Sequence, residues 1–147
     1  MTTYQIHALE PAVLDRARAA AGTERSLAAG GEALRCCLRD ARAGEAVMLF
    51  NYEPPLPPSP YREIGAVFAH AEPCPGRADD GGYPEEWLGR PQVLRAYDAR
   101  GRIHPASRVH DGSDPEAAIV AVLTDPEVVQ IHSRNVAYGC LMLRIQR

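Results

Sequence analysis

The sequence contains no lysine, and all 16 basic residues among its 147 are arginines. With 19 acidic residues the formal net charge is -3, and because the arginines are scattered along the chain, no basic face is available to neutralise phosphates. We therefore expect no nucleic-acid partner. Arginine does offer paired donors to carboxylates and phosphates, so single arginines are candidates for anion binding.

Long hydrophobic runs are also missing. Runs such as residues 46–50 are far too short to cross a bilayer, and the first seven residues lack the basic and apolar regions of a signal peptide. These absences predict a cytoplasmic protein without a membrane partner. The four cysteines include no C-x-x-C pair, which in a reducing compartment favours free thiols over disulfides.

Several catalytic motifs are absent as well. The chain has no glycine-rich phosphate loop, no G-x-S-x-G elbow, no H-E-x-x-H helix and no paired-carboxylate motif, so we expect no standard cofactor. A metal site would have to use groups without the close paired spacing of structural zinc sites, and the spacing therefore does not favour a metal. The groups considered for it are His70-x-x-x-Cys74, His104, His110, His132 and Cys140.

What is present is an ordinary globular composition, with 46% hydrophobic and 24% charged residues. A chain of this length is typical of one domain, which we place over residues 1–147. Patterns typical of strands occur at residues 4–9, 34–39, 46–52, 66–70, 93–97, 102–109, 128–132 and 140–145. Helices are predicted after Pro11 and from the capping box at residues 113–116 to about Thr124.

Most neighbouring strands are predicted to pair as hairpins, including residues 34–39 with 46–52. The result is an α+β fold with a mainly antiparallel sheet of about seven strands and two helices. The strand, helix and strand of residues 102–132 are the one candidate for a parallel pairing. Two loops interrupt the pattern. Residues 53–60 include five prolines, typical of a rigid extended connector, and residues 71–90 form a long loop of a kind that is often functional.

Several ordered motifs between Leu34 and Arg147 resemble the bacterial family known as domain of unknown function 1203. The motifs are Asp40-Ala41-x-x-Gly44-Glu45, Asn51-Tyr52-Glu53, Pro60-Tyr61-Arg62-x-x-Gly65, Leu94-Arg95-Ala96-Tyr97-Asp98 and Ile131-His132-x-x-Asn135-x-x-x-Gly139-Cys140. The chain departs from the family pattern where it has Leu34-Arg35 instead of a Cys-Arg pair, and Arg134 instead of a second histidine. The family carries no established activity, so the resemblance implies relatives and no reaction.

If the last two strands pair around residues 133–139, His132 and Cys140 face each other across the hairpin. An imidazole beside a thiol lowers the pKa of the thiol and creates a nucleophile. The alternative is that Cys140 is a small buried hydrophobic residue and His132 a hydrogen-bonded structural one. Asn135 either orients His132 or occupies a turn position.

The anion-binding candidates are Arg35, Arg62 and Arg134, whose alternative role is ion pairing with neighbouring carboxylates. Tyr61 either supplies a hydroxyl group to a pocket or only packs the proline-rich loop.

Two functional hypotheses follow. In the first, the protein binds a small molecule or anion, or is a thiol-dependent enzyme, with its pocket between the loops of residues 60–65 and 133–139. In the second, it is a non-catalytic interaction or accessory protein, including a homodimer, that uses the proline-rich loop and a sheet edge.

Overall fold

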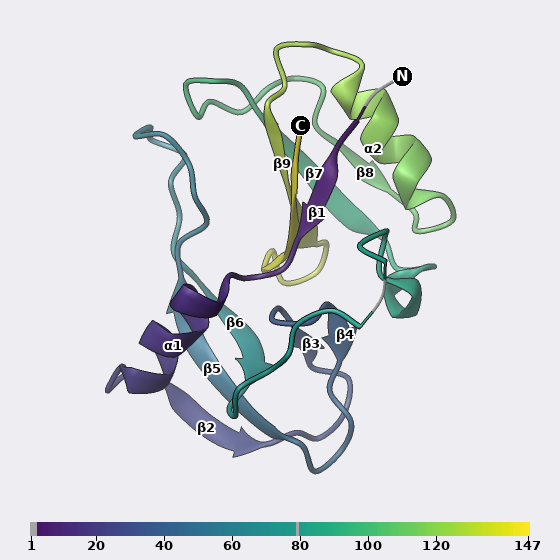
Figure 1. The fold of residues 1–147 in the computed structure, drawn as a ribbon. Helices are drawn as coiled ribbons and strands as arrows, with labels where there is room; N and C mark the ends of the chain where they lie inside the picture. Colours follow the sequence, from purple (N-terminus) through teal and green to yellow (C-terminus); the bar gives the residue numbers. More distant parts are fainter. Residues whose placement is uncertain (1–2, 79) are drawn as a thin grey trace.

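Two five-stranded sheets form the framework of the computed structural model, which describes residues 3–78 and 80–147. Sheet A contains, in spatial order, β1 (Gln5–His7), β10 (Leu141–Gln146), β9 (Gln130–Asn135), β7 (Gln92–Tyr97) and β8 (Arg108–His110). Sheet B contains β2 (Glu24–Leu27), β5 (Ala46–Tyr52), β6 (Gly65–His70), β3 (Ala33–Leu34) and β4 (Arg39–Asp40). Figure 1 shows sheet A above sheet B. Of the segments discussed above, Met1, Thr2 and Asp79 lie outside the described residues.

Each sheet has its own helix. Helix α1 (Pro11–Ala19) lies beside β5, and α2 (Pro115–Leu123) packs on sheet A (Figure 1). Helix α2 begins where the sequence predicts, with the Asp114 carboxylate accepting a hydrogen bond from the Ala117 amide at 3.1 Å. A short 3-10 helix, η1 (Glu85–Trp87), interrupts the long loop. Within the described part of the chain, no helix is long and apolar enough to cross a bilayer.

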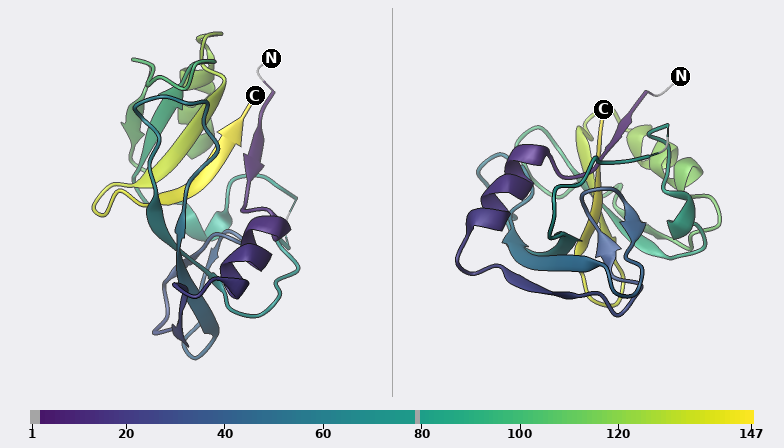
Figure 2. Two further views of the ribbon diagram at one scale, coloured as in Figure 1. Left: turned by 90° about the vertical axis from the view of Figure 1, so that its left-hand side faces the viewer. Right: turned by 60° about the horizontal axis from the view of Figure 1, so that its bottom comes forward.

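The two hydrophobic cores interlock. The sheet A core includes Leu38, which comes from the β3–β4 turn of sheet B. The sheet B core in turn includes Leu141, the first residue of β10 in sheet A. Each half therefore contributes a buried side chain to the other, and the turn after β3 is held at the junction of the two sheets (Figure 2).

The predicted α+β class with two helices is confirmed, although ten strands form two sheets where the sequence predicted about seven in one. The predicted hairpin of residues 34–39 with 46–52 is wrong. Residues 35–38 form a turn, so this segment provides only the two-residue strands β3 and β4. Strand β5 pairs instead with β2 and β6. Short polar strands such as β2, which is exposed, lack the apolar pattern that would reveal them.

The parallel pairing also differs from the prediction. Strands β8 and β9 run in the same direction on either side of β7, with which both pair antiparallel. Among the described strands, the parallel ladder joins β3 to β6 through Leu34 and Phe68. This long-range pairing places the turn after β3 beside the end of β6, where His70 lies.

Candidate metal site

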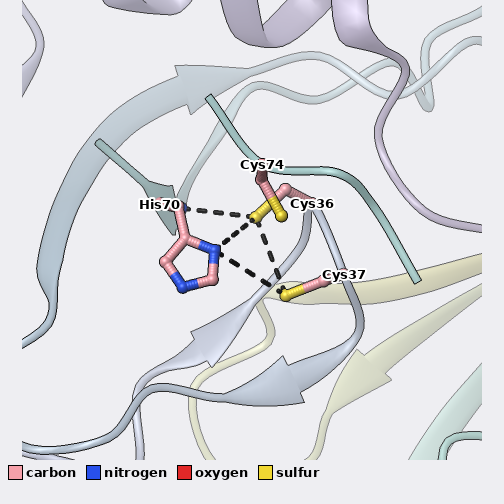
Figure 3. A group of neighbouring side chains, drawn as sticks. All are labelled: Cys36, Cys37, His70 and Cys74. Carbon is pink, nitrogen blue, oxygen red and sulfur yellow. Dashed lines mark hydrogen bonds between the residues drawn. The ribbon is translucent and has the colours of Figure 1, made fainter. Parts of the chain in front are cut away.

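The turn between β3 and β4 has an unusual backbone. The Leu38 amide donates to the Leu34 carbonyl at 2.9 Å, and Leu38 has a φ of 56°, which costs a non-glycine residue about 1–2 kcal/mol. Leu38 is only 3% exposed, so its burial in the sheet A core offsets this cost. The turn directs the consecutive residues Cys36 and Cys37 toward the end of β6 (Figure 3).

Four side chains with metal-binding atoms converge there. They are Cys36 and Cys37 from the turn, His70 at the end of β6 and Cys74 from the loop that follows it. Their sulfur atoms and one imidazole nitrogen all lie within 4.8 Å of one another. Figure 3 shows the four groups pointing into one common space.

The distances suit a tetrahedral ion. The Cys36 and Cys37 sulfurs are 3.9 Å apart, and they lie 3.4 and 3.9 Å from His70 Nδ1. Zinc bonds of about 2.3 Å to sulfur and 2.0–2.1 Å to nitrogen imply ligand-to-ligand separations of roughly 3.6–3.8 Å in a tetrahedron. Cys36, Cys37 and His70 are therefore spaced much like three corners of a zinc site, and the Cys74 sulfur lies within 4.8 Å of their ligand atoms.

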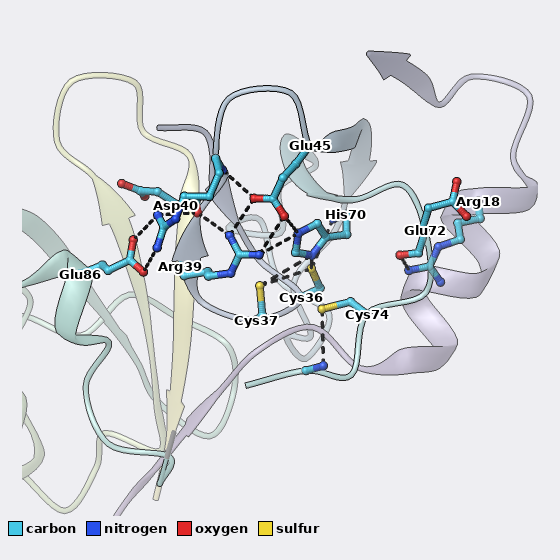
Figure 4. Close-up of polar contacts among 12 residues, drawn as sticks. Arg18, Cys36, Cys37, Arg39, Asp40, Glu45, His70, Glu72, Cys74 and Glu86 are labelled. Carbon is cyan, nitrogen blue, oxygen red and sulfur yellow. Dashed lines mark hydrogen bonds and ion pairs between the residues drawn. The ribbon is translucent and has the colours of Figure 1, made fainter. Parts of the chain in front are cut away.

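The other imidazole nitrogen is held by a carboxylate. His70 Nε2 lies 2.9 Å from Glu45 Oε2 and 3.3 Å from Arg39 Nη2 (Figure 4). Because a carboxylate only accepts, the closer contact favours the tautomer with its proton on Nε2, in which Nδ1 keeps the lone pair that a metal needs. Glu45 is itself fixed by two hydrogen bonds of 2.9 Å from the Arg39 guanidinium and one of 2.6 Å from the Arg42 amide. These contacts, led by that of Arg39, hold the pKa of Glu45 well below its usual range.

Of the three cluster cysteines, Cys36 is set up as a thiolate, whereas burial raises the pKa of Cys74. Backbone amides donate to two of the sulfurs, from His70 to Cys36 at 3.3 Å and from Gly76 to Cys74 at 3.4 Å. The contact with Cys37 is the largest influence that lowers the pKa of Cys36 to about 5, and the same contact raises the pKa of Cys37. Cys36 is 2% exposed and Cys37 8% exposed, so the thiolate is largely shielded from water.

Sequence spacing did not reveal this group. The His70-x-x-x-Cys74 segment is a candidate in the sequence, but nothing in the spacing connects the vicinal pair Cys36 and Cys37 with it. The other residues considered with that segment, among them His104 and Cys140, are not part of the cluster. The available signal was the combination of a Cys-Cys pair, a later His-x-x-x-Cys segment and a loop of unusual length.

The predicted hairpin required Cys140 to lie beside His132. In the structure the two residues are not adjacent. His132 pairs with Arg144, whereas the Cys140 carbonyl accepts a hydrogen bond of 2.8 Å from the Asn135 amide. Three residues of strand, about 10 Å, therefore separate the two positions. The reason is that β9 continues to Asn135, so the turn begins three residues later than predicted. The catalytic role of Cys140 and His132 therefore stays a prediction, and the adjacency on which it depended is not present.

His132 has a buried, structural environment. It is 1% exposed, its Nε2 lies 3.1 Å from Gln130 Oε1, and its ring centroid is 4.6 Å from that of Tyr97. Burial is the largest of the effects that lower its pKa to about 3, and the charges of Arg134 and Arg144 add to it. His132 is thus neutral at physiological pH.

The remaining predicted site residues are spread over the C-terminal turn and the proline-rich loop. The side-chain oxygen of Asn135 accepts a hydrogen bond of 2.9 Å from the Tyr138 amide, which agrees with a role in the turn. Arg134 pairs with Glu63 at 3.0 Å and Arg62 pairs with Glu53. Tyr61 is 38% exposed on the loop.

Arg35 differs from these arginines because it is only 5% exposed. It lies next to Cys36 in the β3–β4 turn, and its Nε donates to the Leu141 carbonyl at 2.7 Å. Burial lowers its pKa to about 10, so Arg35 is a buried cation at neutral pH.

All four residues of the candidate metal site lie in a part of the chain that matches a known protein family. A model of the family described as protein of unknown function DUF1203 matches residues 31–147, a range that contains all four cluster residues. A search of the curated proteins and a search of the solved structures each found no match. Because the matched range is most of the chain, this protein belongs to the DUF1203 family of proteins of unknown function.

Proposed function

We propose that this protein binds Zn²⁺ through Cys36, Cys37, His70 and Cys74. The observation that carries the proposal is the convergence of three sulfurs and one imidazole nitrogen within 4.8 Å. The Glu45 carboxylate on the other imidazole nitrogen of His70 adds to this observation. Such a carboxylate commonly supports a zinc-bound histidine, and a merely accidental cluster of cysteines would give no reason for it.

The ligand chemistry favours zinc among the common divalent ions. Thiolates and imidazole are soft or borderline ligands, which suit Zn²⁺ and do not suit Mg²⁺ or Ca²⁺. A set of three cysteines and one histidine is one of the standard structural zinc sets. Four protein ligands complete a tetrahedron, so the site leaves no open position for a substrate.

A closed site of this kind acts by holding chain segments together. Here the ion would join the β3–β4 turn, the end of β6 and the loop that carries Cys74. That loop continues to Trp87 and Arg90, which both donate to the Asp40 carboxylate on β4. We infer that zinc binding fixes the long loop on sheet B and contributes directly to folding stability.

The test is the metal content of the protein purified without added metal, measured by plasma mass spectrometry. The proposal predicts about one zinc ion per chain, as four ligands bind one ion. Cys36→Ser and Cys74→Ser should lose most of the zinc. Cys140→Ser is the matched control, because Cys140 is the one cysteine outside the cluster, and it should keep the ion.

Wild-type protein that neither carries zinc nor takes it up at micromolar concentration under reducing conditions contradicts the proposal. Equal zinc content in the Cys74→Ser and Cys140→Ser variants contradicts the assignment of ligands. Circular dichroism of each variant shows whether it is folded, so loss of metal is not confused with loss of structure.

Small-molecule binding near the C-terminal hairpin is a second candidate function. It is supported by a cavity of about 270 Å³ lined by Cys140, Arg134, Glu63 and Gly65, between the two loops named by the first sequence hypothesis. A thiol-dependent reaction there lacks support from the position of His132. Alkylation of Cys140 as a function of pH tests it: a thiolate that reacts already near pH 6 supports the enzyme, and ordinary thiol reactivity opposes it.

A further inference from the structure

The β3–β4 turn also carries Arg35, whose surroundings differ from those of the cysteine cluster. The Arg35 guanidinium donates to the carbonyls of Leu141 and Ala33 and contacts the Met142 sulfur at 3.8 Å. Among the described residues it forms no ion pair with a carboxylate. A buried cation with only neutral partners is costly, and guanidinium groups have five N–H donors, so Arg35 has donors left for an anion.

Arg35 lines a small cavity of about 70 Å³ where the two sheets meet. His7 of β1 and Arg144 of β10 line the same cavity, and these two residues are register partners across the β1–β10 ladder. The Nε2 atom of His7 is buried and has no hydrogen-bond partner among the described residues. Two cations and an unpartnered imidazole nitrogen thus surround a space with room for about two water molecules, or for one carboxylate group.

The small cavity adjoins a larger groove of about 640 Å³ between α1 and β5, and both are lined by Glu10, Val13, Tyr52 and Pro55. Figure 1 shows β1 leading directly into α1 at this junction. A volume of this size is typical of pockets for small organic ligands. Ala17 and Phe50 add apolar surface to the groove.

The charges around the groove define the class of ligand. Arg35 and Arg144 favour an anion at the inner end, whereas the Glu10 carboxylate lines both spaces and opposes a second negative charge. Arg16 and Glu53 also line the larger groove, and Glu53 is paired with Arg62. The apolar wall of Val13, Ala17 and Phe50 suits a hydrocarbon body. A singly charged carboxylate fits this arrangement better than a doubly charged phosphate.

We propose that Arg35, Arg144 and His7 bind the carboxylate of a small monocarboxylic acid whose apolar body occupies the groove between α1 and β5. This site is independent of the zinc cluster, because it shares none of the four ligands. It provides the protein with a ligand-binding function in addition to metal binding.

The test uses octanoate as a probe and octanamide as its uncharged counterpart, with binding to wild-type protein as purified measured by titration calorimetry and NMR. Octanoate should bind at least about tenfold more tightly than octanamide, since hydrogen bonds to a charged group are stronger than those to a neutral one. Octyl phosphate should bind more weakly than octanoate. Octanoate that does not bind at millimolar concentration, or that binds no better than octanamide, overturns the proposal.

Variants locate the site. Because Arg35 also donates to two carbonyls, its removal affects folding, so Arg144→Gln is the primary variant and should weaken octanoate binding about tenfold or more. Val13→Trp should block the groove for both probes. Arg100→Gln, an exposed arginine outside both cavities, is the control and should bind as wild type does. If folded Arg144→Gln and Val13→Trp proteins bind octanoate as tightly as wild type does, the assignment of the carboxylate site is contradicted. This holds whether or not the proteins contain zinc.

Discussion

The Nε2 atom of His70 and the Oε2 atom of Glu45 are 2.9 Å apart, and this contact orients the imidazole so that Nδ1 faces three cysteine sulfurs. Glu45 belongs to the β4–β5 connection and His70 to the end of β6, so the pairing of β5 with β6 brings them together. The metal site therefore depends on sheet B for its supporting contacts as well as for its ligands.

Replacing this carboxylate should weaken metal binding without removing a ligand. Glu45→Gln should lower zinc affinity about 10–100-fold, the usual effect of losing the partner of a ligating histidine. Competition with a chromophoric chelator measures it. Glu86→Gln is the matched control, because Glu86 pairs with Arg42 and does not contact His70. Equal affinities of the two variants would show that Glu45 does not support the site.

Thiol reactivity should divide the cysteines into two classes. In zinc-loaded protein, a thiol reagent should label Cys140 and leave Cys36, Cys37 and Cys74 protected, because metal-bound thiolates react slowly. Adding a strong chelator should expose the three protected thiols. Mass spectrometry after labelling identifies the sites. Three cluster cysteines that react at the rate of Cys140 before chelation would contradict the assignment.

Stability should fall in mild acid because of His132. Its pKa is lowered from 6.5 to about 3 in the folded protein, chiefly by burial, and Arg95, Arg134 and Arg144 surround it. Between these two values the unfolded state binds a proton that the folded state does not, so stability is complete above pH 6.5 and is lost as the pH falls toward 3. The contribution of this residue approaches about 1.4 kcal/mol per pH unit.

Denaturant unfolding of wild type and His132→Gln between pH 7 and pH 5 measures the effect, in a range above the titration of most carboxylates. The free energy of unfolding should decrease more steeply with acid in wild type than in the variant. Parallel pH profiles would mean that His132 is not held neutral in the folded state.

Two glycines should respond differently to alanine. A Cβ atom at Gly112 would lie 2.3 Å from the backbone nitrogen of Arg90 and 2.4 Å from the carbonyl carbon of Gly89. A Cβ atom at Gly139 would have no neighbour within 4 Å among the described residues, apart from those next to it in the chain. Both residues have positive φ, 86° and 76°. Gly139→Ala should therefore cost about 1 kcal/mol, and Gly112→Ala more than about 3 kcal/mol. Chemical denaturation measures both, and equal losses would exclude a close contact at Gly112.

The sequence predicted the elements whose signals are local. Helix α2 follows from the Asp114-Pro115 start and an apolar face, and β5 follows from its uninterrupted apolar run. The resemblance to the family was also confirmed. In contrast, β3 and β4 are two residues each, and no periodicity can reveal strands so short.

The candidate site could not be derived in the same way. Cys36 and Cys74 meet only because β3 pairs in parallel with β6 through Leu34 and Phe68, and such long-range pairing leaves no spacing pattern. The pairing of Cys140 with His132 was wrong for the opposite reason. It depended on a local estimate of a turn boundary, and a shift of three residues was enough to separate the two side chains.

The central claim is that one zinc ion is held by three thiolates and one imidazole. X-ray absorption at the zinc edge of the purified wild-type protein tests it most directly. The account predicts a first shell of three sulfurs at about 2.3 Å and one nitrogen at about 2.0–2.1 Å. A shell dominated by oxygen and nitrogen, or one that keeps three sulfurs in the Cys36→Ser variant, would contradict it.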